Sequence, residues 1–185
     1  MKQQINELGY TQGYFPFNKE EIREFETIAK KASELSTNER KNIFHYFPLV
    51  KELFDRAIHE SPFQLQLTDY CFYIEKNTND RNWPLLFHKD INLPDYINIS
   101  NETKMDFLKN AMMFRLTLDT SDKDTGAIKV IPKSHLDELK TEDEVFIDTK
   151  EGEVIFFKPL LLHGSNKMKR PHKRRVFQAL CVEIK

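Results

Sequence analysis

The first third of the chain carries the apolar spacing of amphipathic helices. Between residues 18 and 35, apolar side chains recur three and four positions apart, as on one buried helix face. Asn18 stands at the start of this run, and acidic residues come soon after Asn18. This pattern is typical of a capped helix N-terminus. The same spacing predicts a second helix from about Pro48 to His59, and a short strand over residues 13–17 precedes both. Residues 1–60 are therefore predicted to be mainly helical.

From Pro62 onward the pattern changes to the alternation and short apolar runs of β-strands. Clusters of Pro, Gly and acidic residues separate the runs, and no helical crossover lies between them, which favours an antiparallel sandwich or barrel. We therefore predict an α+β fold, with a double-stranded β-helix (a cupin-like jelly roll) over residues 61–185 and the N-terminal helices packed on one sheet. The expected strands cover residues 64–68, 70–75, 112–119, 127–131, 145–148, 153–157 and 175–182.

Length and composition favour a single domain over residues 1–185. This length is near the usual size of one domain, and neither an internal repeat nor a linker divides the chain. Apolar residues make up 39% of the sequence and 15 residues are Phe, which excludes a disordered chain. We expect the phenylalanines to pack between the two sheets and to form the dry walls of the functional site.

The charge balance excludes a strong general attraction to polyanions. The chain has 28 basic and 29 acidic residues and a net charge of -1, so we expect no binding to nucleic acid or to a membrane surface. Two cysteines far apart in the sequence favour free thiols, and neither a signal segment nor a membrane span is found. We expect a cytoplasmic protein with a small-molecule substrate. Six cations within residues 167–175 would suit an anionic one.

The spacing of histidines and carboxylates gives the candidate chemistry. A mononuclear iron site of the oxygenase kind uses two imidazoles and one carboxylate on one face of the metal. In a His-x-Asp triplet on a strand, both side chains project to the same face. Two triplets occur, His88-Lys-Asp90 and His135-Leu-Asp137. Such a short motif is weak by itself, so its context has to decide.

Context favours the first triplet. His88 lies in an apolar segment, 75 residues before His163, and that distance allows several strands between them. His135 follows a turn signal and lies only 28 residues before His163, which favours a surface or turn-packing histidine. Gly164 would let the backbone pass close to a ligand.

Two neighbouring arginines are candidates for binding an anion. Arg174 and Arg175 stand at the start of the last predicted strand, eleven and twelve residues after His163. A buried guanidinium there could bind a dicarboxylate bidentately. The alternative is that the basic run is a solvated surface patch.

Four stretches in chain order carry a resemblance to a known family. They are Asn82-Trp-Pro-Leu-Leu-Phe-His-Lys-Asp, Phe114-Arg-Leu-Thr-Leu-Asp with Thr125-Gly-Ala-Ile-Lys-Val-Ile-Pro-Lys-Ser-His, Gly152-Glu-Val-Ile-Phe-Phe-Lys-Pro-Leu-Leu-Leu-His-Gly-Ser, and Lys173-Arg-Arg-Val-Phe-Gln. Together they resemble the phytanoyl-CoA dioxygenase family of Fe(II)/2-oxoglutarate oxygenases. The resemblance runs from about residue 13 to residue 183.

The resemblance implies roles for particular residues. His88, Asp90 and His163 correspond to the metal ligands and catalytic centre, and His135 to a recurrent family position outside the metal shell. Arg174 corresponds to the residue that binds the distal carboxylate of 2-oxoglutarate. Arg175 is the alternative, because strand alternation sends only one of the two inward. Ser165 and Thr117 are further candidates for binding the same co-substrate.

The resemblance also implies an activity. The enzyme would use Fe(II), 2-oxoglutarate and O2 to hydroxylate a small metabolite or lipid-derived acid, with release of succinate and CO2. The carboxylate of Asp90 points to hydroxylation, since a small residue there would open the site for halide, as in related halogenases. The alternative is a non-enzymatic or differently metallated cupin-like binding protein. Such a protein would have no reason to place Arg174 beside Ser165.

Overall fold

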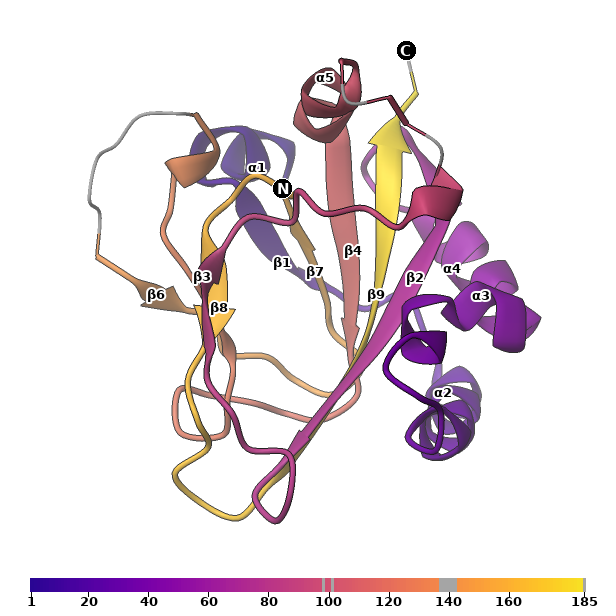
Figure 1. The fold of residues 1–185 in the computed structure, drawn as a ribbon, viewed down its shortest axis with the longest axis vertical. Helices are drawn as coiled ribbons and strands as arrows, with labels where there is room; N and C mark the ends of the chain where they lie inside the picture. The colour runs from indigo at the N-terminus through magenta and orange to yellow at the C-terminus, as the bar shows by residue number, and fades with distance from the viewer. Residues whose placement is uncertain (98, 101, 137–142, 185) are drawn as a thin grey trace.

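Two antiparallel β-sheets face each other in the computed structural model, which describes residues 1–97, 99–100, 102–136 and 143–184 (Figure 1). Within these residues one sheet has five strands in the order β1-β7-β4-β9-β2, and the other has four in the order β3-β8-β5-β6. The larger sheet contains β1 (Tyr10–Tyr14), β2 (Leu65–Asn77), β4 (Ala111–Thr117), β7 (Val154–Phe157) and β9 (Lys173–Glu183). The smaller sheet contains β3 (Leu85–His88), β5 (Ile128–Val130), β6 (Val145–Phe146) and β8 (His163–Ser165).

From β2 onward the chain passes repeatedly from one sheet to the other. Strands β2, β4, β7 and β9 lie in the larger sheet, and β3, β5, β6 and β8 in the smaller one. All pairings are antiparallel, and this arrangement is a jelly roll. The predicted α+β fold of jelly-roll type is therefore confirmed.

Helices cover the outer face of the larger sheet. Helices α2 (Lys19–Ala32), α3 (Ile43–Tyr46) and α4 (Pro48–His59) lie on this side in Figure 1. At the start of α2, Asn18 Oδ1 accepts a hydrogen bond from the Glu21 amide, and the Glu21 carboxylate accepts one from the Asn18 amide. This reciprocal capping confirms the predicted start of the helix.

Some elements differ from the sequence-based prediction. Helices α1 (Lys2–Leu8), α3 and α5 (Lys104–Lys109) were not expected, because each is too short to show a helical period. The first strand lies at residues 10–14 instead of 13–17. The two runs expected at 64–68 and 70–75 form one strand, β2, whose register shifts between Leu67 and Cys71. In the described parts of the chain, no helix combines the length and the apolar character needed to cross a membrane.

Most buried phenylalanines lie between the helices and the larger sheet. Phe54 of α4 is fully buried, with its ring centroid 4.8 Å from that of Phe114 on β4 and 5.6 Å from that of Phe25 on α2. The prediction that the phenylalanines pack between the two sheets is therefore wrong for most of them, although Phe157 does belong to the cluster between the sheets. The buried phenylalanines of the helix-side cluster are Phe25, Phe44, Phe54, Phe63, Phe114, Phe156 and Phe177.

Strand alternation explains this distribution. On β4, Met112, Phe114 and Leu116 belong to the helix-side cluster, whereas Met113, between Met112 and Phe114 in the chain, belongs to the cluster between the sheets. The larger sheet is therefore covered by hydrophobic contacts on both faces. The interior between the sheets keeps room for polar side chains.

We expect Phe54→Ala to destabilise the protein strongly. Removal of this central ring should lower the free energy of unfolding by about 3–5 kcal/mol, because a cavity remains among the neighbouring rings of Phe17, Phe25, Phe44 and Phe114. Phe15, which is 52% exposed, provides the control, and Phe15→Ala should change stability by about 0.5 kcal/mol or less. Denaturant unfolding measures both. Equal losses would contradict the placement of the helix-side core.

Candidate metal centre

His88 and His163 face each other across two paired strands. Strand β3 ends at His88, strand β8 begins at His163, and the two residues are direct partners in the antiparallel register. Their ring centroids are 4.3 Å apart. A turn over residues 159–161 precedes His163, and β8 continues from it to Ser165.

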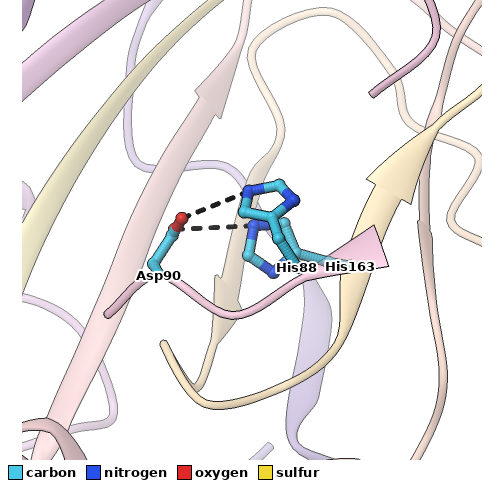
Figure 2. A group of neighbouring side chains, drawn as sticks. All are labelled: His88, Asp90 and His163. Atoms are coloured by element: carbon cyan, nitrogen blue, oxygen red, sulfur yellow. Dashed lines mark ion pairs between the residues drawn. The ribbon is translucent and has the colours of Figure 1, made fainter. Parts of the chain in front are cut away.

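Asp90 completes the group although it lies beyond the end of β3. The expectation that His88 and Asp90 share a strand is therefore wrong. The Asp90 amide donates a hydrogen bond of 2.8 Å to the Pro159 carbonyl, which ties this segment to the turn before β8. Figure 2 shows the result: Asp90 Oδ1 lies 3.4 Å from His88 Nε2, and Oδ2 lies 3.5 Å from His163 Nε2. One ligand atom from each residue lies within 4.8 Å of the others.

Backbone carbonyls set the orientation of both imidazoles. The Nδ1 atoms of His88 and His163 lie 2.9 and 2.8 Å from the carbonyl oxygens of Leu86 and Leu161. A carbonyl oxygen only accepts, so each neutral ring carries its proton on Nδ1 and keeps the Nε2 lone pair free. Both Nε2 atoms point toward Asp90. This is the tautomer that a metal ligand needs.

The electrostatics of the group suit a cation. Burial lowers the pKa of His163, which favours the neutral, ligating form. The contact with Asp90 raises the pKa of the more exposed His88. Burial opposes the charged form of Asp90, but the contact with His88 and the charges nearby prevail, and the pKa of Asp90 lies below its usual range. Two imidazoles and one carboxylate form the donor set of a facial triad.

A buried arginine lies in the pocket beside the triad. Arg174 is 2% exposed and, like Ser165, lines this pocket. Its Nη1 donates a hydrogen bond to the Gly126 carbonyl, whereas its Nε has no hydrogen-bond partner in the part of the chain that the structure describes. Burial lowers the pKa of Arg174 to about 10, so the guanidinium remains charged at neutral pH.

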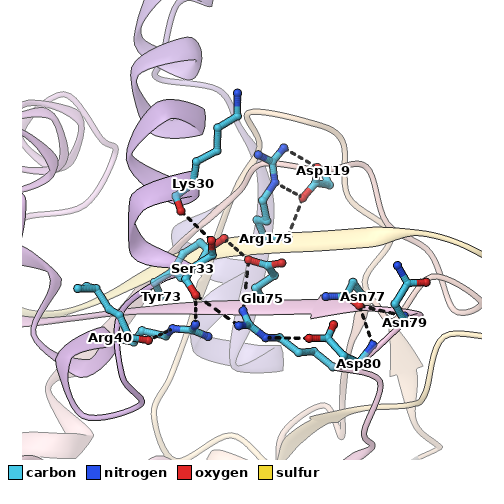
Figure 3. Close-up of polar contacts among 12 residues, drawn as sticks. Lys30, Ser33, Arg40, Tyr73, Glu75, Asn77, Asn79, Asp80, Asp119 and Arg175 are labelled. Carbon is cyan, nitrogen blue, oxygen red and sulfur yellow. Dashed lines mark hydrogen bonds and ion pairs between the residues drawn. The ribbon is translucent and has the colours of Figure 1, made fainter.

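Arg175 points to the opposite face of the sheet. Its Nε and Nη2 donate hydrogen bonds of 3.0 and 2.8 Å to the Asp119 carboxylate (Figure 3), and Nη2 also donates one of 3.0 Å to Glu26 on α2. Of the two neighbouring arginines, only Arg174 lines the pocket. Strand alternation therefore separates an arginine in the pocket from one that attaches a helix to the sheet.

Two further cations of the basic run lie against an acidic loop. Lys169 Nζ is 3.5 Å from the Asp124 carboxylate, and Arg170 forms an ion pair with Asp122. Together with the Arg175–Asp119 pair, these contacts offset much of the positive charge of residues 167–175. Because only Arg174 of this run lines the pocket, the run itself does not argue for an anionic substrate.

Lys76 was missed by the sequence analysis. It lies on β2, is 1% exposed, and its Nζ donates a hydrogen bond of 2.7 Å to Ser165 Oγ. Burial, and then the charges of Arg174 and Arg115, lower the pKa of Lys76 to about 7. The signal was present in the alternation of β2, where Lys76 follows the pocket-lining Phe72 and Ile74 at two-residue spacing.

Three other residues singled out in the sequence have different surroundings. Thr117 is buried, and its hydroxyl has no hydrogen-bond partner among the described residues, but it does not line the pocket. His135 lies near α1, with Nε2 3.2 Å from the Asn6 carbonyl and outside the triad, while Asp137 lies outside the described residues. At Gly164 an added Cβ would lie 2.6 Å from the Leu85 carbonyl oxygen. The close approach expected at Gly164 is thus to the backbone of β3.

A family model described as phytanoyl-CoA dioxygenase (PhyH) matches residues 1–176. The chain belongs to the phytanoyl-CoA dioxygenase family. This confirms the family predicted from the four sequence stretches. A search of curated protein sequences found no match.

Solved structures of other proteins share the fold. The carbocyclase SnoK from nogalamycin biosynthesis, described as non-heme and alpha ketoglutarate dependent, has a TM-score of 0.75 and 16% identity over 98% of this chain and 82% of its own. EctD from S. alaskensis with 2-oxoglutarate and 5-hydroxyectoine has a TM-score of 0.73 and 19% identity over 98% of this chain and 74% of its own. EvdMO1 has a TM-score of 0.70 and 16% identity over 99% of this chain, which spans 49% of EvdMO1.

We expect Lys76→Met to stabilise the protein more at pH 6 than at pH 9. Folding lowers the pKa of Lys76 from 10.5 to about 7. At low pH the buried positive charge of Lys76 therefore costs the folded protein stability. This cost is fully present below about pH 7 and fades as the pH rises toward 10.5, because the unfolded chain then binds more protons than the folded one.

Denaturant unfolding at the two pH values measures the difference, which should be on the order of 2 kcal/mol. Lys173→Met, at an exposed position on β9, is the control and should show no such dependence on pH. A gain from Lys76→Met that is the same at both pH values would contradict the assigned titration.

Proposed function

We propose that the protein is an Fe(II)- and 2-oxoglutarate-dependent oxygenase that hydroxylates a small metabolite or lipid-derived acid and releases succinate and CO2. One observation carries the proposal: both His Nε2 atoms converge on Asp90 in a pocket that also holds buried Arg174, whose Nε has no partner among the described residues. Membership of the family supports it. So do the structures of EctD, one of which is described with bound Fe and another with 2-oxoglutarate.

His88, Asp90 and His163 fit the role of iron ligands. Their donor atoms form the two-histidine, one-carboxylate set, and the two rings already present the required tautomer. When bound there, Fe(II) would supply the redox chemistry that couples O2 to the decarboxylation of 2-oxoglutarate and the oxidation of substrate. Three protein ligands leave the other positions of an octahedral ion available for the co-substrate and O2.

The neighbouring pocket suits a dicarboxylate. Arg115, Arg174 and Lys76 bring buried positive charge to this region, while Asp90 is the one carboxylate among the described residues that line the pocket. A carboxylate beside Ser165 could accept hydrogen bonds from Arg174 Nε and Lys76 Nζ and would offset charges that are costly to bury alone. We assign the distal carboxylate of 2-oxoglutarate to this position. Thr117 of β4, whose buried hydroxyl has no partner among the described residues, stays a further candidate although it does not line the pocket.

The substrate would approach from the side of His88. The His88 side chain is 36% exposed, compared with 6% for His163, so the triad is open to solvent on this side. Leu85 of β3 lies at the pocket, the exposed Leu86 is the next residue of the same strand, and the exposed Trp83 precedes the strand. These side chains could contact the apolar part of a small organic molecule, while the inner apolar walls limit the entry of water.

We expect the iron-loaded protein to show a visible charge-transfer band when 2-oxoglutarate is added without oxygen, and to release succinate when O2 is admitted. Asp90→Ala should lose both signals, because the metal then lacks its one anionic protein ligand. Absorption spectroscopy and succinate assay measure the two.

Folding of each sample should be checked by circular dichroism. A folded wild-type protein with no such band would falsify the oxygenase proposal. Tight binding of metal without any response to 2-oxoglutarate would favour the cupin-like binding protein instead. Succinate release that persists in Asp90→Ala and remains coupled to substrate would overturn the triad.

The same substitution at two neighbouring positions tests the anchor of 2-oxoglutarate. Arg174→Lys should weaken 2-oxoglutarate binding by about tenfold or more, since lysine cannot reproduce a bidentate guanidinium contact. Arg175→Lys should change this affinity less than about threefold, although it weakens the contacts to Asp119 and Glu26.

Tryptophan fluorescence can report the binding. Trp83 is the one Trp of the chain, and its ring centroid lies 5.8 Å from Lys76 Nζ, beside the assigned carboxylate position. A larger loss of affinity in Arg175→Lys than in Arg174→Lys would reverse the assignment.

A further inference from the structure

A buried hydrogen-bonded pair of side chains, Arg115 and Gln178, lies next to Asp90. Arg115 on β4 and Gln178 on β9 are direct partners in the antiparallel register and are 5% and 2% exposed. Arg115 Nη1 donates a hydrogen bond of 2.7 Å to Gln178 Oε1, and Gln178 Nε2 donates one of 3.2 Å to Asp90 Oδ2. The three side chains form a chain of donors that ends on the carboxylate of the triad.

Arg115 sets the orientation of the Gln178 amide. A guanidinium has only donors, so the group facing it must be the carbonyl oxygen of Gln178. The amide nitrogen then has to face Asp90, which as a carboxylate only accepts. Reversing the amide would place two donors against each other and a carbonyl oxygen against a carboxylate. The chemistry of the two ends therefore allows one arrangement.

Asp90 depends on such support more than the two histidines do. His163 is the first residue of β8 and His88 the last of β3, whereas Asp90 lies in the segment after β3. Its side chain contacts His88 and His163, but both Nε2 atoms would turn to the metal when one binds. The hydrogen bond from Gln178 is the contact that a metal leaves in place.

Arg115 is directed differently from the other cations of the pocket. Arg174 and Lys76 contact Gly126 and Ser165, at the position assigned to the co-substrate carboxylate. Arg115 instead donates a hydrogen bond to Gln178, whose amide nitrogen donates one to Asp90. Its geometry therefore points to the metal side of the pocket.

We propose that Arg115 and Gln178 are positioning residues that hold the Asp90 carboxylate in place for the metal, with Arg115 acting through Gln178. The identity of the ion as Fe(II) rests on the function proposed above. The proposal itself concerns the affinity for a divalent metal, so it can be tested without 2-oxoglutarate and without turnover.

The first test measures Mn(II) binding to the metal-free protein by calorimetry. Gln178→Met keeps much of the side-chain length but removes the donor to Asp90, and it should weaken Mn(II) binding about 10- to 100-fold. Leu180→Met, on the same face of β9, is the matched control for disturbance of the interior and should bind Mn(II) like wild type. The visible spectrum of the Co(II)-loaded protein should shift in Gln178→Met and stay unchanged in Leu180→Met.

The second test asks whether Arg115 acts through Gln178. Arg115→Met should weaken Mn(II) binding in the wild-type background but add little in the Gln178→Met background, since the contact to Asp90 is already lost. Thermal unfolding checks that each variant folds. If Arg115→Met does not fold, Arg115→Lys serves in its place. Lysine keeps a donor and a charge, so Arg115→Lys should retain part of the affinity.

Three results would overturn the inference. Gln178→Met could bind Mn(II) as wild type does, or the Arg115 substitution could cost the same affinity in both backgrounds. The Arg115 substitution could also weaken only 2-oxoglutarate binding, measured by Trp83 fluorescence, which would make Arg115 a co-substrate ligand. A wild-type protein that binds neither Mn(II) nor Fe(II) would instead remove the proposed function, and this inference with it.

Discussion

The antiparallel pairing of β3 with β8 is the constraint on which the site depends. It places His88 directly opposite His163, although 75 residues separate them in the chain. Gly164 permits this pairing, because any side chain there would collide with the Leu85 carbonyl of β3. The link between the Asp90 amide and Pro159 then carries the segment after β3 back toward β8. Three donors thus converge through backbone contacts that do not need a metal.

Because side chains alternate along a strand, neighbouring residues of the larger sheet lie on its two opposite faces. On β9, Arg174 faces the pocket. Arg175 faces α2 and forms ion pairs with Glu26 of that helix and with Asp119. On β4, Phe114 packs under the helices while its neighbour Arg115 reaches toward Gln178 and the triad. One sheet therefore supports a dry aromatic core on one side and a charged interior on the other.

The buried charges make the interior costly without a ligand. Three cations approach one carboxylate in a space of low dielectric, and burial lowers the pKa of both Lys76 and Arg174. Such an arrangement lowers the stability of the ligand-free chain, and the binding of an anion would offset the surplus positive charge. The same buried positive charge would favour binding of the dianionic co-substrate. The stability of the protein and its affinity for the co-substrate are therefore linked through these residues.

Short-range patterns in the sequence were sufficient to predict helices α2 and α4, the strand-rich part of the chain from Pro62 onward, and the family. Capping at Asn18, helical spacing and two-residue alternation are local properties, and they appear in the structure close to where they were expected. The residues His88, Asp90 and His163 could also be named, because the His-x-Asp spacing and the family resemblance are written in the chain. Their convergence and tautomers could not be read there. These follow from cross-strand register and backbone carbonyls.

The tertiary structure alone decided which polar side chains share the interior. Lys76, Arg115 and Gln178 come from three different strands, and no spacing along the chain relates them. It also decided that the phenylalanines pack mostly against helices and that Lys169, Arg170 and Arg175 of the basic run form ion pairs with acidic residues within 119–124. Sequence patterns show which residues share a face of one strand. Which faces meet depends on how the sheets pair and pack, and that is a property of the folded chain.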